Sequence, residues 1–225
     1  MQRILEPELM DDPIQAAAYA AADFADPHGL FIRTFQGVFA GRNITGPVLD
    51  LGCGPADISI RFARAYPDCF IHGVEGARAM LCEGETALNR SGLHHRIELV
   101  QGVIPHIEPP LKKYQVLLCN SLLHHLHDPS VLWKYIMKYS TGDTLIFVMD
   151  LMRPWTCQDA EKLVNTYCGS EPENLRRDFY NSLCAAFRPK EVEMQLADAG
   201  LQGLRINVIS DRHLIVYGKI IDAQK

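Results

Sequence analysis

The chain has 225 residues, of which 48% are hydrophobic and 22% are charged, as in a folded domain rather than a disordered or fibrous chain. Its net charge of −5 disfavours a general binder of nucleic acids or anionic membranes, because such surfaces are usually basic. Seven cysteines without a C-x-x-C pair favour free thiols and a cytoplasmic location. No apolar run could cross a bilayer, and the acidic N-terminus is unlike a signal peptide.

The first 45 residues are predicted to form a helical cap. Asp12-Pro13 and Asp26-Pro27 each place a capping aspartate before a proline, a combination that favours the start of a helix. The alanine-rich run at residues 16–22 supports the first helix. We therefore expect two helices before the first strand.

From residue 48 onward, strand and helix patterns alternate. Apolar runs predict strands at residues 48–51, 69–74, 96–100, 114–119, 144–149, 204–209 and 213–217. Amphipathic periodicity predicts the intervening helices, two further helices within residues 151–187, and one at residues 189–200. The expected fold is α/β: a three-layer α/β/α sandwich around a seven-stranded, mostly parallel sheet with an antiparallel last strand.

The most informative segment is residues 48–55, with the sequence VLDLGCGP. A buried strand ends near Asp50, and a turn containing Gly52 and Gly54 leads directly into a helix. Such a turn lets a ligand approach the backbone closely, at the edge of the sheet where α/β proteins bind nucleotides. Glu75 ends the second strand, where a carboxylate can accept hydrogen bonds from ribose hydroxyls.

Dinucleotide binding is the natural alternative, but the pattern G-x-G-x-x-G is incomplete. Asp57 occupies the third glycine position, and Asp50 adds a second carboxylate near the expected pyrophosphate. These charges instead favour a cationic ligand with an ammonium and a sulfonium group, such as S-adenosylmethionine (SAM).

Residues 48–55 resemble the first motif of the class I (Rossmann-like) SAM-dependent methyltransferases. Residues 75–81, EGARAML, are similar to the second motif of that family. Residues 120–129, NSLLHHLHDP, resemble the segment after the fourth strand in its small-molecule methyltransferases. The resemblance implies a SAM-binding domain at residues 46–225, in which the insertion 151–187 caps the substrate.

The resemblance also implies which residues bind SAM and its product, S-adenosylhomocysteine (SAH). They are Tyr19, Asp50, Gly52, Cys53, Gly54, Glu75, Gly76, Met80, Gly102, Val103 and Asn120. In this comparison Asn120 would offer its carbonyl oxygen to the methionine ammonium, and Tyr19 would close over the cofactor. Tyr19 could equally lie on a helix surface, and Cys53 could be a packing residue. The family often has an aspartate where this chain has Val103, so a side-chain contact to adenine is missing.

His124 and His125 are the candidate catalytic residues, because a neutral imidazole suits removal of a proton from an acceptor. A metal site is not expected, since no second ligand-rich segment is visible in the sequence. We expect the acceptor to bind between the N-terminal helices and residues 151–187. The mix of cationic, aromatic and amide side chains in that insertion favours an apolar acceptor that carries an anionic group. These residues are Arg153, Trp155, Arg176, Arg177, Phe179, Tyr180 and Asn181.

The resulting function prediction is methyl transfer from SAM to a small molecule. A nucleic-acid (tRNA) methyltransferase and a SAM-binding protein without transferase activity remain as alternatives. The sequence leaves open the identity of the acceptor, the atom that is methylated, and the formation of a homodimer.

Overall fold

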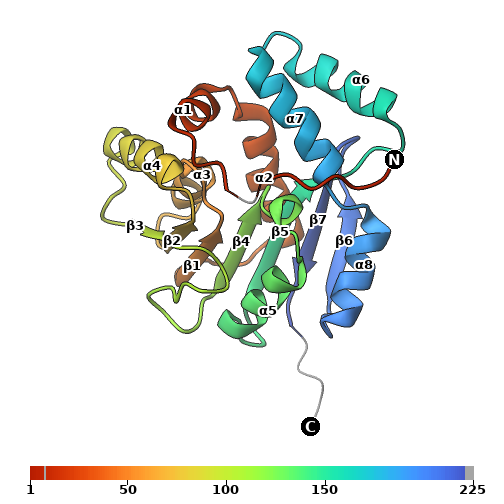
Figure 1. Cartoon of the computed structure of the whole chain (residues 1–225). Coiled ribbons are helices and arrows are strands. Elements are labelled where there is room, and N and C mark those ends of the chain that lie inside the picture. The colour runs from red at the N-terminus through yellow and green to blue at the C-terminus, as the bar shows by residue number, and fades with distance from the viewer. Residues whose placement is uncertain (8, 221–225) are drawn as a thin grey trace.

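The computed structural model describes residues 1–7 and 9–220, and it contains a seven-stranded sheet (Figure 1). Residues 221–225, which end the expected methyltransferase domain, lie outside the described residues. The strand order is β3-β2-β1-β4-β5-β7-β6. Strands β1 to β5 are mutually parallel, whereas β7 runs antiparallel to both of its neighbours. The predicted fold class is confirmed.

The strands agree with the sequence prediction to within about two residues at each end. They are β1 Pro47–Leu51, β2 Phe70–Glu75, β3 Ile97–Gln101, β4 Val116–Asn120, β5 Leu145–Leu151, β6 Leu204–Val208 and β7 His213–Gly218. Strand β2 extends to Glu75, so this carboxylate lies at the carboxyl end of the strand.

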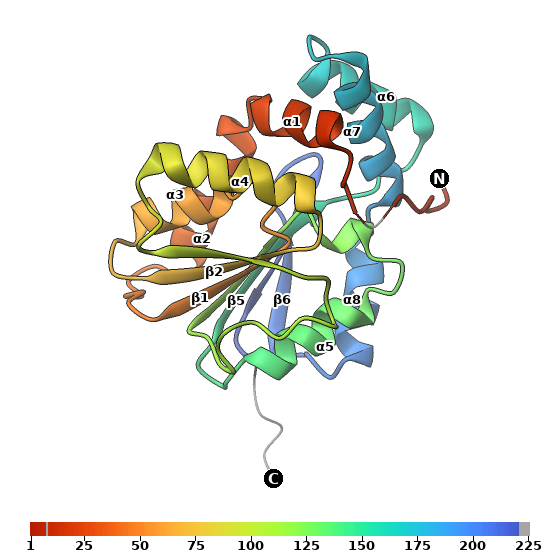
Figure 2. The ribbon, with the colours of Figure 1, turned by 60° about the vertical axis from the view of Figure 1, so that its left-hand side comes forward.

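Helices cover both faces of the sheet (Figure 2). They are α1 Pro13–Ala21, α2 Ala25–Val38, α3 Asp57–Ala65, α4 Arg78–Ser91, α5 Ser130–Tyr139, α6 Cys157–Cys168, α7 Glu173–Ala185 and α8 Pro189–Asp198. Helix α1 begins as predicted, with the Asp12 side chain accepting a hydrogen bond from the Gln15 amide. Helix α2 begins earlier than predicted, because Asp23 rather than Asp26 accepts the amide of Ala25.

Alternate residues of the central strands supply two hydrophobic cores. On one face, Leu117 and Cys119 of β4 belong to the core that includes α5 and α8. On the other face, Val116 and Leu118 belong to the core that includes α2 and α3. Phe31 of α2 is fully buried there, so only part of the expected 1–45 cap lies away from the sheet layers.

The remaining helices, α1, α6 and α7, lie beyond the carboxyl ends of the strands (Figures 1 and 2). Residues 1–7 and 9–12, here called the N-terminal strap, run from the end of α7 to the start of α4. At one end the Arg3 Nε atom donates to Ala185 O at 2.6 Å, and the Ile4 amide donates to Cys184 O. At the other end Asp11 accepts a hydrogen bond from the Ala79 amide. The strap thus connects segments that are far apart in the sequence.

Candidate functional site

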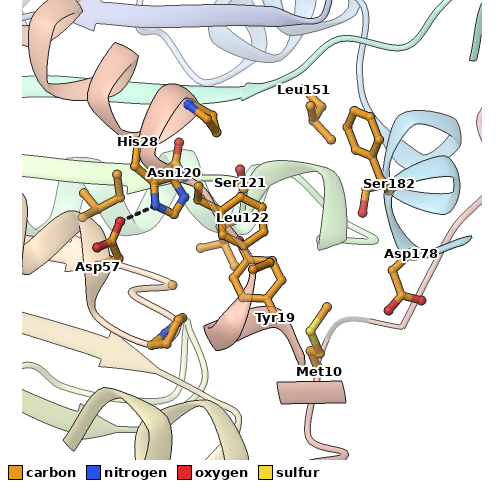
Figure 3. A pocket seen from close by; sticks show the side chains of 18 of the residues that line it. Met10, Tyr19, His28, Asp57, Asn120, Ser121, Leu122, Leu151, Asp178 and Ser182 are labelled. Carbon is orange, nitrogen blue, oxygen red and sulfur yellow. Dashed lines mark hydrogen bonds and ion pairs between the residues drawn. The ribbon is translucent and has the colours of Figure 1, made fainter. Parts of the chain in front are cut away.

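A cavity of about 370 Å³ opens beyond the carboxyl ends of the parallel strands. Its size falls within the range of roughly 300–1,000 Å³ that is usual for small-molecule sites. Figure 3 shows Asn120, Ser121 and Leu122 after strand β4, with Tyr19 and Met10 on the N-terminal side and Asp178 and Ser182 on α7. The cavity is therefore enclosed by the sheet edge, the N-terminal region and the insertion.

Most of the predicted cofactor residues line this cavity. They are Tyr19, Asp50, Gly52, Cys53, Gly54, Glu75, Met80 and Asn120. Gly76, Gly102 and Val103 do not line it and lie beyond Glu75. A Cβ atom at Gly76 would contact Leu9 of the strap, and one at Gly102 would overlap Ile107.

The predicted glycine turn is present, and both of its glycines adopt the left-handed backbone conformation. Gly52 has a φ of 68° and Gly54 a φ of 51°, backbone angles that residues with a Cβ atom rarely adopt. A Cβ at Gly52 would lie 3.0 Å from the Leu122 side chain, whereas a Cβ at Gly54 would meet no atom within 4 Å. The backbone at Gly54 therefore faces open cavity space.

Two carboxylates support this turn. The Asp50 carboxylate accepts a 2.6 Å hydrogen bond from Ser59 Oγ, and burial raises the pKa of Asp50 to about 6. The Glu75 carboxylate accepts the amides of Gly54 at 3.0 Å and Ala77 at 2.8 Å, and burial raises the pKa of Glu75. Each carboxylate oxygen can accept a second hydrogen bond, so Glu75 retains capacity for ribose hydroxyls.

Asn120 provides the observation most specific to a ligand. It ends strand β4 and lines the cavity, and its Oδ1 atom is buried and has no hydrogen-bond partner among the described residues. A buried carbonyl oxygen without a donor costs free energy, and an ammonium group in the cavity would satisfy it. Asn120 therefore fits the methionine end of SAM.

The third acidic residue of the region is neutralised. Asp57 accepts hydrogen bonds from His28 Nδ1 and Arg61 Nε, each at 2.6 Å (Figure 3). Burial opposes ionisation of Asp57, but these two partners lower its pKa. The negative electrostatic potential expected at the turn therefore comes mainly from the carboxylates of Asp50 and Glu75.

Tyr19 and Met80 form the apolar part of the cofactor half. Both side chains belong to one small hydrophobic cluster with Ala16. Tyr19 packs against Phe24, with ring centroids 4.6 Å apart, and burial raises the pKa of Tyr19 to about 12. Tyr19 thus faces the cavity rather than a free helix surface.

His124 and His125 both line the cavity, on the short helical turn Leu123–His125. His124 Nδ1 lies 2.5 Å from Asp150 Oδ1, and its Nε2 atom lies 3.4 Å from Glu6 Oε1. Burial alone would lower the pKa of His124, but the carboxylates of Asp150 and Glu6 raise it above its usual value. Burial, followed by the adjacent His124, lowers the pKa of His125 to about 3.

The acceptor half differs from the sequence prediction in its chemistry. Of the expected residues only Phe179 lines the cavity. Arg153 is buried against Ala186 O and Glu191, Arg176 bonds Asn165, and Trp155 is 74% exposed. The remaining expected residues, Arg177, Tyr180 and Asn181, also lie outside the lining.

Carboxylates take the place of the expected cations. The cavity lining includes Glu171 and Asp178 from the insertion, and Asp23 and Asp26 from the segment around Phe24. Among the described residues that line the cavity, Arg212 is the one arginine, and it is paired with Asp211 and stacked on the Tyr167 ring. The prediction that arginines of the insertion bind an anionic group of the acceptor was therefore wrong. Those arginines instead form hydrogen bonds and ion pairs with backbone carbonyls and neighbouring side chains.

Comparisons with known proteins agree with this geometry. Residues 48–138 match the sequence model of a family described as a methyltransferase domain. An uncharacterized methyltransferase of Schizosaccharomyces pombe is 28% identical over 90 residues, which cover 38% of this chain and 32% of that protein. The match thus spans about a third of the length of this relative.

Solved structures show the same fold over nearly the whole chain. A SAM-dependent methyltransferase from Aquifex aeolicus has a TM-score of 0.66 and 15% identity, covering 93% of this chain and 99% of that one. The plantazolicin methyltransferase BpumL in complex with SAH has a TM-score of 0.71 and 14% identity, covering 93% of this chain and 91% of that one. These structures confirm the predicted fold, and the match of residues 48–138 to a methyltransferase domain agrees with the resemblance found in the sequence.

Proposed function

We propose that this chain, which carries a SAM-dependent methyltransferase domain, binds SAM in the described cavity and transfers its methyl group to a small molecule. The unpartnered Oδ1 atom of Asn120, buried beside the glycine turn, is the observation that carries the proposal. It offers an acceptor where the ammonium group of SAM would need one.

The cofactor half of the site supports a division of roles among its residues. Asn120 would hold the ammonium, Asp50 and Gly54 would surround the methionine part, and Glu75 would accept the ribose hydroxyls. Met80 and Tyr19 would provide apolar contacts near the adenine. Gly76, Gly102 and Val103 would act through the backbone at the adenine edge, outside the present cavity lining.

SAM, when bound, supplies an electrophilic methyl group on a sulfonium centre. The chain then has to orient the acceptor in line with that group and exclude competing water. The walls from α1 and α7 supply such an enclosure, since Tyr19 and Phe179 both line the cavity. No residue needs to form a covalent bond to either reactant.

The lining favours a neutral or cationic acceptor. Asp178 is held by a 2.7 Å hydrogen bond from Gln15 Nε2, which fixes a carboxylate at the acceptor half. Arg177, 66% exposed, lies 3.6 Å from Asp178 and offsets part of its charge, but Glu171, Asp23 and Asp26 add further carboxylates to the lining, so an anionic acceptor would be repelled. Nucleic acid is disfavoured for the same reason, together with the net charge of −5.

The catalytic role of His124 and His125 stays a prediction. His124 contacts carboxylates through both ring nitrogens, which favours its protonated form. His125 is neutral but too weakly basic, with a pKa of about 3, to remove a proton efficiently by itself.

Calorimetry with SAM, SAH and NADH tests the cofactor proposal. We expect binding of SAM and SAH but not of NADH, and an Asn120→Leu variant should lose affinity for both. A methyl-release assay with mixtures of amines and phenols then distinguishes a transferase from a protein that only binds SAM. Binding of NADH in preference to SAM would contradict the proposal.

Two broader expectations remain proposals. The seven cysteines are all unpaired, which supports a reducing location such as the cytoplasm. In the described part of the chain, no helix has the length and apolar composition needed to span a membrane. A homodimer stays a prediction, which size-exclusion chromatography with light scattering would test.

A further inference from the structure

Three potential metal ligands meet beside the cavity, although they come from distant parts of the sequence. Glu6 belongs to the N-terminal strap, whereas His124 and His125 follow strand β4. Each offers a ligand atom, and these atoms all lie within 4.8 Å of one another. The side chains are 11%, 3% and 18% exposed, respectively, so the cluster is largely shielded from solvent.

In the neutral form of His124, two hydrogen-bond acceptors face each other: its Nε2 atom and Glu6 Oε1. Asp150 is bound at 2.5 Å to His124 Nδ1, so the proton of a neutral ring lies on that nitrogen. The lone pair of Nε2 then points toward Glu6 Oε1, 3.4 Å away. Glu6 Oε1 is itself buried and accepts no hydrogen bond in the described structure. Protonation of His124 would place a positive charge on Nε2, yet Glu6 Oε1 still receives no hydrogen bond across this 3.4 Å distance in the described structure. A metal ion bound by both atoms would satisfy both of them.

Two of the three distances between the ligand atoms match those around a bound metal ion. Glu6 Oε1 lies 3.4 Å from His124 Nε2 and 3.4 Å from His125 Nδ1. Two ligands in tetrahedral coordination, each about 2.1 Å from a zinc ion, are about 3.4 Å apart. In the present geometry His125 Nδ1 also lies 3.2 Å from Pro7 O, a contact that the ion would replace.

The surroundings also resemble those of a metal site. Metal-binding histidines commonly donate their other ring N–H to a carboxylate, which orients the ring, and Asp150 stands in that relation to His124. Glu6 and Asp150 contribute two negative charges, whereas Arg3, which donates to His124 O at 2.9 Å, contributes one positive charge. The local balance is therefore favourable to a cation.

We propose that Glu6, His124 and His125 bind one divalent transition-metal ion, with Asp150 as the positioning residue. Two imidazoles and one carboxylate are a ligand set typical of zinc and of other first-row metals. His124 and His125 line the cavity, so the remaining coordination position would face it. If the proposed function holds, that position would be available to a water molecule or to the methyl acceptor; the binding of the ion itself does not depend on it.

Metal binding can be measured without SAM or an acceptor. The chelator-treated, full-length protein would be titrated with Zn²⁺ by calorimetry and with Co²⁺ by visible absorption. We expect one equivalent per chain with micromolar or tighter affinity. The Co²⁺ spectrum should show ligand-field bands without a thiolate charge-transfer band, which excludes the free cysteines as ligands.

Variants identify the site. Glu6→Gln and His125→Asn should each weaken Zn²⁺ binding at least about tenfold, and Asp150→Asn should weaken it about 10- to 100-fold. The control is His94→Asn, because His94 is exposed and forms a hydrogen bond with the Asn89 side chain, away from the proposed metal ligands. Circular dichroism and the melting temperature establish that each variant is folded.

The outcomes are distinct from those of the cofactor experiment. Absence of Zn²⁺ binding in the wild type at about 100 μM would overturn the proposal, and so would unchanged affinity in folded Glu6→Gln and His125→Asn variants. Either result would leave the interpretation of SAM binding intact. Conversely, metal binding without SAM binding would contradict only the proposed function.

Discussion

Replacing Asn120 by leucine should affect the free protein and the SAM complex in opposite directions. In the free protein the buried Asn120 Oδ1 atom has no donor, a situation that costs about 1–3 kcal/mol. Leucine has a similar shape and removes the unpaired acceptor, so the melting temperature of Asn120→Leu should stay level or rise. For a domain of this size, 1 kcal/mol corresponds to about 2–4 °C.

The SAM complex should lose affinity in the same variant. A hydrogen bond to a charged ammonium contributes about 1.5–3 kcal/mol, which corresponds to a roughly 10- to 150-fold increase in Kd. Calorimetry gives the Kd, and differential scanning fluorimetry without and with SAM gives both stabilities. Asn181→Leu is the matched control, because Asn181 is exposed on α7 outside the cavity lining. It should leave SAM affinity unchanged.

The result that would refute this reasoning is a folded Asn120→Leu protein with normal SAM affinity. A lowered melting temperature combined with unchanged Kd would show that Asn120 serves the structure alone. Such a result would also remove the main support for placing the methionine ammonium at this point of the cavity.

Three further predictions concern the turn beside Asn120. Burial raises the pKa of Asp50 to about 6, so the folded protein loses stability as the pH rises from about 4 to 6 and Asp50 ionises. A cationic ligand favours the ionised carboxylate, so the affinity of the wild type for SAM should decrease when the pH is lowered through about 6. The Asp50→Asn variant should not show this decrease, and calorimetry at several pH values measures it. Gly54→Ala and Gly52→Val should each cost about 1–2 kcal/mol of stability, because both glycines have a positive φ. Gly54→Ala should in addition block SAM, since its Cβ enters the cavity, whereas Gly52→Val should lose further stability through contact with Leu122. Denaturant melts and SAM titrations measure the two effects, and equal losses of affinity at equal stability would contradict the distinction. Glu75→Ala should weaken SAM by about 1–3 kcal/mol and also lower stability, since two backbone amides lose their acceptor; a variant with unaltered Kd would rule out the ribose contact.

The order of strands and helices was predictable because it depends on local patterns. Apolar runs marked every strand, and Asp12-Pro13 marked the start of α1. The presence of Gly84 within α4, where glycine weakens the helical pattern, is explained by the packing of the helix against the sheet. A Cβ at this position would lie 2.9 Å from Leu99 of β3, so glycine permits the close approach of helix and strand.

The candidate site was predictable where it follows the sheet and not where it depends on distant segments. The glycine turn, Glu75 and Asn120 each end a strand, and parallel strands bring such ends together. Glu6 and Asp150 were missed, because nothing in their local sequence indicates that they contact His124. The arginines of the insertion were misassigned for a related reason, since their partners, such as Glu191 for Arg153, lie in other elements.

The contacts between the N-terminal strap and α7 have a consequence for folding during synthesis on the ribosome. Arg3 is hydrogen-bonded to Ala185, 182 positions along the chain, so this contact cannot form until residue 185 has left the ribosome. At about 5–20 residues per second, the first residues would wait roughly 10–40 s for their partners. The central strands can pair during that interval. The contacts of the N-terminal strap with α7, and the cluster of Glu6, His124 and His125, would form last. A nascent chain stalled before residue 185 should therefore present an open site, with its amino end still accessible to proteases and processing enzymes.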